Sequence, residues 1–119
     1  MSKAANPGEL RTPVYFFRRE KDTDADGDHI EALVNVFGEG KVIRCKWVNA
    51  HGSEVFEALQ QQLREPATIT CRYSSKINRT LEVQKGLSDT ELYEIISVDD
   101  VEEKHKWMEI KVQRKEAAR

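Results

Sequence analysis

An acidic segment containing a glycine has the residue types of a calcium loop. Asp22, Asp24 and Asp26 alternate and are followed by Gly27, the pattern that turns alternate carboxylates toward one ion before a sharp bend. Leu33 stands where the acidic residue that closes such a loop, at about its twelfth position, is required. We therefore interpret the segment as an ordinary acidic β-turn, with a weak metal site at the three aspartates as the alternative.

The other residues with catalytic or metal-binding chemistry are scattered along the chain. His29, His51 and His105 have no cysteine or second histidine at metal-ligand spacing. The acidic run 99–103 is typical of a solvated loop. No nucleophile, base and orienting group can be nominated together. We expect no catalytic residues, no metal centre and no cofactor, and hence a protein that is not an enzyme.

Basic residues next to aromatic residues raise a different possibility. On the faces of a small barrel, such pairs form a groove that binds nucleic acid through phosphate contacts and base stacking. Solvated strand faces explain them equally well. The residues are Arg18 and Arg19 after Phe17, Arg44 and Lys46 beside Trp47, and Arg72 beside Tyr73.

Length and composition limit the protein to one small domain. Its 119 residues carry 19 Lys and Arg against 21 Asp and Glu, so the net charge is −2. This near-neutral balance removes the main signature of a general nucleic-acid binder. No apolar stretch approaches the ~18 residues that suggest a membrane span, so we expect no membrane partner. Cys45 and Cys71 lack CxxC spacing, which predicts reduced thiols in the core.

The order of patterns predicts a mainly β fold. We expect a flexible arm over residues 1–9, one domain over 10–114 and a charged tail over 115–119. The predicted architecture is a small β-barrel or sandwich of about six to seven short strands with one surface α-helix. The predicted strands are residues 13–19, 30–37, 41–48, 67–73, 80–84, 92–98 and 107–114, and the helix is about Ser53–Arg64.

The predicted helix is amphipathic. Ser53 is a suitable N-cap, and Val55, Phe56, Leu59 and Leu63 recur at helical spacing before Pro66. We expect this apolar face to pack on the core while the opposite face meets solvent.

Several segments, in their order along the chain, resemble the head-tail joining proteins of tailed bacteriophages and prophages, also called head closure or stopper proteins. The resemblance covers about Asn6 to Arg114. The segments that carry it are Asn6 to Arg11 (NPGELR), Cys45 to Val48 (CKWV), Gly52 to Ala58 (GSEVFEA), Ala67 to Tyr73 (ATITCRY), Leu92 to Val98 (LYEIISV) and Trp107 to Ile110 (WMEI).

The resemblance implies a small β-barrel with one helix that stacks as a ring, dodecameric in the virion, beneath the portal and adaptor. There it closes the DNA exit channel and presents a docking surface for the tail. Its implied partners are copies of itself, portal and adaptor proteins, tail-completion or tail proteins, and packaged DNA without sequence specificity. The implied location is the virion, after synthesis in the bacterial host cytoplasm. There are two alternative functions: a tail-completion protein of the same particle, or a small nucleic-acid-binding barrel. A further hypothesis is that the isolated subunit stays monomeric until a template ring collects it.

Within that resemblance, two groups of residues are the candidate contact sites. For contacts with neighbouring subunits or the adaptor we nominate the arm and the polar helix face: Asn6, Leu10, Arg11, Glu54, Glu57, Gln60, Gln61 and Arg64. For the channel or tail side we nominate the acidic turn and the loop region 76–91: Asp24, Asp26, Asp28, Lys76, Arg79 and Lys85.

Overall fold

Seven antiparallel strands form most of the regular secondary structure in the part of the chain that the structure describes. The computed structural model describes residues 7–60, 62–86 and 91–115. In chain order the elements are η1 (Pro7–Glu9), β1 (Thr12–Thr23), β2 (His29–Asn35), β3 (Ile43–Asn49), α1 (Ser53–Gln60), β4 (Ala67–Arg72), β5 (Glu82–Lys85), β6 (Leu92–Asp100), η2 (Val101–Glu103) and β7 (Trp107–Arg114).

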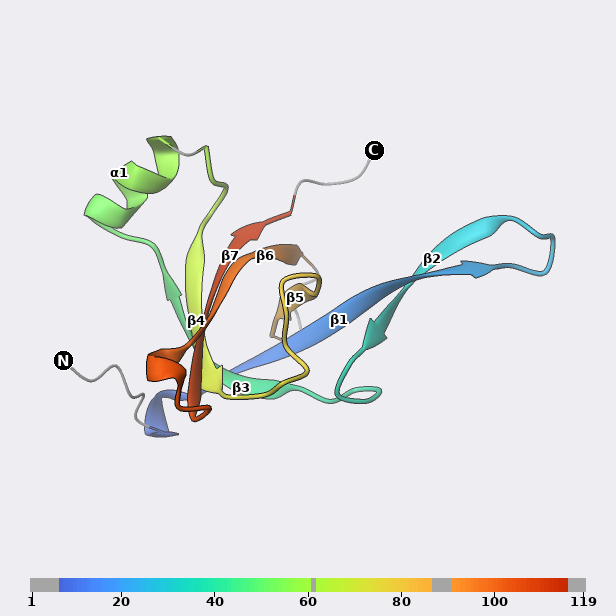
Figure 1. The fold of residues 1–119 in the computed structure, drawn as a ribbon. Coiled ribbons are helices and arrows are strands. Elements are labelled where there is room, and N and C mark those ends of the chain that lie inside the picture. Colours follow the sequence, from blue (N-terminus) through green and yellow to red (C-terminus); the bar gives the residue numbers. More distant parts are fainter. Residues whose placement is uncertain (1–6, 61, 87–90, 116–119) are drawn as a thin grey trace.

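Six of the strands close into a barrel, and the seventh lies outside it. The sheet order is β2-β1-β3-β4-β7-β6-β5, and β1 also pairs with β5. Strand β1 takes part twice, because residues 12–17 close the barrel while residues 17–23 leave it as a long ribbon with β2 (Figure 1). The predicted mainly β barrel with one short helix is confirmed.

Period-two alternation fills the barrel interior as predicted. Phe16, Ile69 and Ile110 are fully buried, each on a strand whose neighbouring residues point outward. Because each strand contributes alternate side chains, burial of one face can be read from the sequence without knowing which strands are neighbours.

The two cysteines meet inside the barrel. Cys45 on β3 and Cys71 on β4 are both free and fully buried. The adjacent Cys71 thiol and burial raise the pKa of the Cys45 thiol far above its usual range. The prediction of reduced core thiols is confirmed.

Several predicted boundaries are wrong, since β2 ends at Asn35, β3 begins at Ile43 and β6 runs to Asp100. Three further differences have a visible cause. Strand β1 runs to Thr23 because Glu20 to Thr23 pair with β2. Helix α1 ends at Gln60, four residues early, because Gln62 has a φ of 59° and its N–H donates to the carbonyl of Leu59. Strand β5 begins at Glu82 because the preceding residues form a turn.

Candidate assembly surfaces

The β1–β2 ribbon, which we define as residues 18–35, projects from the barrel. Its register runs from Phe17 opposite Asn35 to Thr23 opposite His29. In the described part of the chain, β2 pairs only with β1, and β1 beyond Phe17 pairs only with β2. The ribbon therefore presents a free strand edge on each side. Figure 1 shows it extending away from the rest of the fold, and the long axis of the molecule measures 56 Å.

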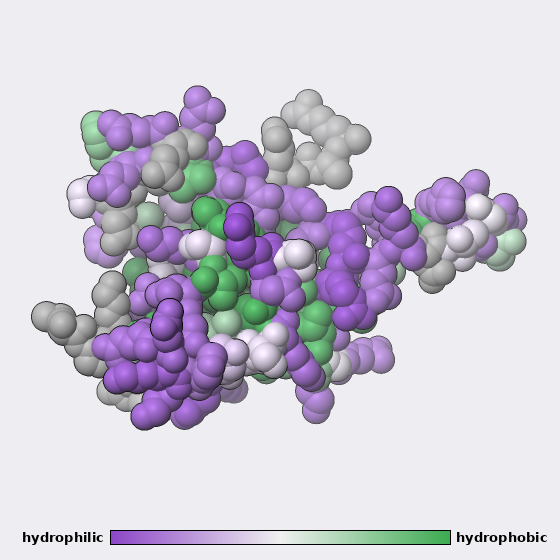
Figure 2. Space-filling view, in the orientation of Figure 1, coloured by the Kyte–Doolittle hydropathy of each residue, from purple (hydrophilic) through white to green (hydrophobic). Residues whose placement is uncertain are grey.

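The β2 half of one ribbon face continues the apolar interior of the barrel outward, opposite the charged residues Arg18 and Glu20 of β1. Val36 packs against the core, while Val34 and Ala32 are half-buried and Ile30 is 43% exposed. These residues alternate along β2 and so share a face. Leu33, also exposed, points to the opposite face. Figure 2 shows the ribbon as a mainly hydrophilic projection with paler and hydrophobic residues near its tip.

The acidic turn at the ribbon tip is organised by Asp24. Its Oδ1 accepts hydrogen bonds from the backbone N–H groups of Asp26 and Asp28, both at 2.9 Å, and Gly27 has a φ of 84°. The predicted acidic turn between two strands is confirmed. The Asp22 side chain lies outside the described atoms, and elsewhere in the described residues no three candidate ligands gather as a metal would require.

An ion cluster around the buried carboxylate of Glu82 anchors the ribbon where it leaves the barrel. The Nε and Nη2 atoms of Arg19 donate to the two carboxylate oxygens of Glu82, at 2.6 and 2.7 Å, and the Nζ of Lys115 donates to Glu82 Oε1 at 2.9 Å. Arg19 also contacts Glu31 at 2.9 Å. The bonds from Arg19, and then from Lys115, lower the pKa of the Glu82 carboxyl despite its burial. Sequence analysis missed this cluster, because its members are far apart in the chain.

The apolar face of helix α1 does not pack on the core, so that expectation is wrong. Phe56 is 64% exposed and Leu59 68% exposed, and Val55 is exposed as well. The helix stands away from the barrel on the segments that follow β3 and precede β4 (Figure 1). A groove of about 410 Å³ separates them, lined by Val55 and Leu59 on the helix and by Lys85 and Tyr93 on the barrel.

The predicted polar helix residues lie in different settings. Glu57 is exposed and lines a second groove of about 490 Å³ with Lys46 and Lys111. Gln60 is exposed. Arg64 lies beyond the helix and is held by the barrel, because its Nε donates to the carbonyl of Arg114 at 3.1 Å. Gln61 lies outside the described residues, as does the side chain of Glu54.

The described residues of the arm, from Pro7 on, lie at the lower left of Figure 1, away from helix α1 at the upper left. Lys46 on β3 forms an ion pair with Glu9 of η1 at 2.7 Å. Leu10 is half-buried, and the Nε of exposed Arg11 donates to the carbonyl of Gly8 at 2.9 Å. Asn6 lies outside the described residues. The structure therefore does not unite the predicted subunit contacts of arm and helix in one patch.

The predicted channel-side residues are also dispersed. Lys76 lies over the ring of Phe37 at 5.6 Å, and Lys85 over the ring of Trp47 at 5.0 Å. Arg79 is exposed, and the three aspartates lie at the ribbon tip. The region 76–91 is not a loop throughout, because it contains β5 and because three of its described apolar side chains are buried, namely Ile77, Leu81 and Val83.

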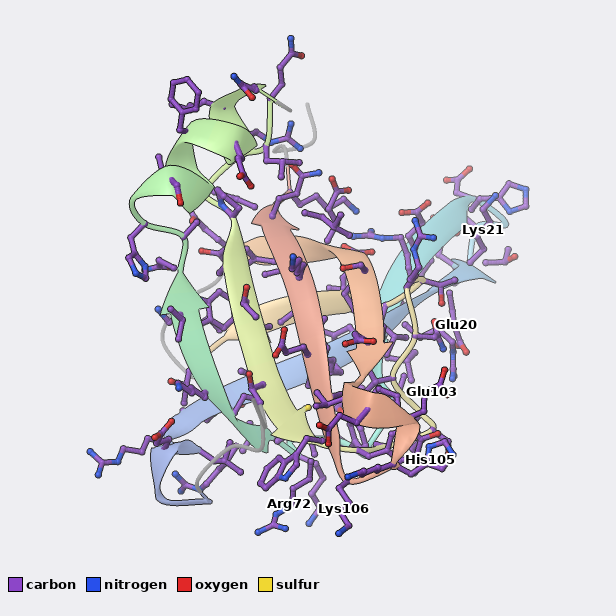
Figure 3. The ribbon with its side chains drawn as sticks, turned by 60° about the vertical axis from the view of Figure 1, so that its left-hand side comes forward. Glu20, Lys21, Arg72, Glu103, His105 and Lys106 are labelled. Carbon is purple, nitrogen blue, oxygen red and sulfur yellow. The ribbon has the colours of Figure 1, made fainter. Side chains whose placement is uncertain are left out.

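The basic residues next to aromatics do not form one groove. Arg18 and Arg19 lie on the ribbon in ion pairs with acidic side chains. Arg44, Lys46 and Arg72 lie on the outer side of β3 and β4, and Arg72 stacks over Trp107 at 5.3 Å. Figure 3 shows Glu20 and Lys21 on the ribbon, apart from Arg72, His105 and Lys106 at one end of the barrel.

Comparison with known proteins adds a family and a fold relative. A family model described as phage head completion protein matches residues 5–116. The solution structure of protein SF1141 from Shigella flexneri 2a is similar, with a TM-score of 0.64 and 20% identity over 92% of this chain and 96% of that one. At this identity the likeness shows the fold alone. No curated protein matches the sequence. Among the described residues no helix has the length and apolar character to span a membrane.

Proposed function

The chain belongs to the phage head completion protein family, a family of structural proteins, and we propose that it forms a ring beneath the portal and adaptor of a tailed phage or prophage. The ring closes the DNA exit channel after packaging and offers the tail its docking surface. The virion is its site of action and the bacterial cytoplasm its site of synthesis.

The observation that best supports a ring is the position of the two unpartnered projections. The ribbon and helix α1 lie toward opposite ends of the molecule (Figure 1), and both expose large apolar side chains, including Ile30, Leu33, Phe56 and Leu59. A cyclic assembly uses two different surfaces of each subunit, one for each neighbour. Exposed apolar residues of this kind mark protein interaction sites. The chain thus has the features of a subunit whose surface is completed by neighbours.

Deletion of the gene from its phage or prophage tests this function. Particles made without the protein are expected to be filled or leaking heads and separate, intact tails in electron micrographs. A plasmid copy of the gene should restore joined particles. Normal infectious particles in the deletion strain would overturn the proposal.

A binding experiment locates the protein within the particle. The purified chain is applied to immobilised portal–adaptor rings and, in parallel, to tail tubes. We expect it to bind the portal–adaptor rings. Binding to tail tubes alone would instead identify a tail-completion protein.

A further inference from the structure

The free edges of the ribbon differ in charge. Along the edge of β1 that continues from β5, the residues whose backbone points outward are Arg19 and Lys21. Along the outer edge of β2 they are Glu31 and Leu33. Over residues 18–22, β1 carries Arg18, Arg19 and Lys21 against Glu20 and Asp22, whereas Glu31 is the one carboxylate of β2 and no Lys or Arg accompanies it. The β1 edge therefore has a net positive charge and the β2 edge a net negative one.

Three backbone hydrogen bonds fix which residues point outward. The carbonyl of Pro13 accepts from Gly86 on the β5 side of β1, while the carbonyl of Phe16 accepts from Val36 on the β2 side. Since backbone direction alternates along a strand, odd-numbered residues of β1 point to the β5 side and, beyond Phe17, to the free edge. On β2 the even-numbered residue Val36 points toward β1, as does Asp28, whose carbonyl accepts from Asp24. The odd-numbered residues of β2 therefore point outward.

We propose that the ribbons of neighbouring copies of this chain pair edge to edge, the β1 edge of one copy with the β2 edge of the next. The occupant of each free edge is thus a second copy. An exposed strand edge is a template for pairing with another chain. The inference deepens the proposed function by naming the contact that builds the ring.

Charge selects this pairing over the two like-edge alternatives. Pairing β1 with β1 would join two edges of net positive charge, and pairing β2 with β2 would join two edges of net negative charge. Like charges opposite one another in a sheet are destabilising, whereas opposite charges are favourable. The mixed pairing brings Glu31, which also contacts Arg19 of its own chain, beside the net positive β1 edge of the next copy.

The mixed pairing also has the geometry of a ring. Because the two edges differ, each added copy leaves one free edge of each kind, and the contact repeats head to tail until the assembly closes. Under rotational symmetry every β1 runs one way and every β2 the other, so each new contact is antiparallel, like the pairing within the ribbon.

Sedimentation velocity of the full-length chain over micromolar to submillimolar concentrations tests the pairing. We expect concentration-dependent association, with slowed hydrogen exchange at the outward N–H groups of Lys21 and Leu33. A chain that stays monomeric over this range, or associates without this protection, would overturn the proposal.

A proline substitution tests the edge itself. Leu33→Pro removes an outward N–H but no hydrogen bond to β1, so the fold is retained, and Leu33→Thr is the control that keeps the N–H. Leu33→Pro should weaken association by at least about tenfold relative to Leu33→Thr. Equal association of the two variants would count against edge pairing. Circular dichroism checks that both fold.

A charge-swap mixture separates contacts between chains from contacts within one chain. Lys21→Glu and Glu31→Lys each place like charges across the ribbon of their own chain, since these residues are directly opposed. Each variant alone should associate poorly, whereas an equimolar mixture should associate, because unlike edges then meet between chains. A mixture no better than its components would refute the mixed pairing. These measurements on purified protein are independent of the deletion phenotype, so the proposed function and the edge pairing can fail separately.

Discussion

Arg19 and Glu82, 63 residues apart in the chain, form a two-bond ion pair at the base of the ribbon. Glu82 lies opposite Phe17, the last residue of β1 that pairs with β5. Arg19 is the second residue beyond that point, so its guanidinium reaches back from the ribbon to the barrel. Lys115, after the last strand, contacts the same carboxylate. The pair therefore fixes the direction in which the ribbon leaves the barrel.

Replacing Glu82 by glutamine should destabilise the fold by about 1 to 3 kcal/mol, because Arg19 and Lys115 lose the charge of their shared partner, whose own side chain is buried. Urea unfolding followed by circular dichroism measures the change. The matched control is Arg18→Ala, which removes an exposed ion pair with Glu20 and should cost no more than about 1 kcal/mol. Equal losses for the two variants would show that the Glu82 cluster does not stabilise the fold.

The same carboxylate predicts a loss of stability in acid. Arg19 and Lys115 lower the pKa of Glu82 in the folded protein. Its contribution is therefore fully present above the unfolded pKa of about 4.3 and is lost as the pH falls through the folded pKa. The difference in unfolding free energy between wild type and Glu82→Gln should be constant near neutral pH and shrink below about pH 4. A difference independent of pH down to acid unfolding would contradict this assignment.

Polar substitutions on the exposed helix face should impair assembly without unfolding the protein. Phe56→Gln and Leu59→Gln remove apolar surface that is already in solvent, so the unfolding free energy should change by less than about 0.5 kcal/mol. Complementation of the deletion strain should nevertheless yield fewer joined particles. The contrasting control is Ile69→Ala in the core, with an expected cost of about 2 to 5 kcal/mol. Destabilisation of similar size by Phe56→Gln would mean that the helix face is covered within the subunit.

The ribbon tip should depend on the Asp24 carboxylate as a hydrogen-bond acceptor. Asp24→Ala removes the acceptor for the N–H groups of Asp26 and Asp28, whereas Asp24→Asn keeps a side-chain oxygen. Hydrogen exchange of those two amides should accelerate in Asp24→Ala and much less in Asp24→Asn. Equal exchange in both variants would remove the role assigned to Asp24.

Calorimetry addresses the alternative interpretation of the same turn. Because the Asp24 carboxylate is used within the turn, we expect no calcium heat at millimolar concentrations. A binding heat that disappears in Asp24→Ala would instead establish a cation site.

Local pattern was enough to predict much of this fold. The alternation of Trp107 to Arg114 predicted β7 to the residue, and the same rule placed Cys45, Ile69 and Cys71 inside. Such predictions succeed because the two faces of a strand are separated by a fixed period of two residues, whichever strands lie beside it. The order of several short sequence segments along the chain also predicted the family that the comparison confirms.

Helix α1 shows where local pattern failed. Its spacing of Val55, Phe56 and Leu59 identified an apolar face, but a sequence period does not tell what covers that face. The helix begins directly after Gly52, and the left-handed backbone at Gln62 and Glu65 turns the chain back into β4. The path of these connections holds the helix away from the barrel.

The sequence by itself determined the strands, their inward faces and the acidic turn, because each depends on residues close together in the chain. Only the tertiary structure decided that β1 closes the barrel with one half and leaves it with the other. The same is true of the contact between Arg19 and Glu82 and of the two free edges of the ribbon. Each of these depends on which distant strands become neighbours, and that choice is made by the packing of the whole chain.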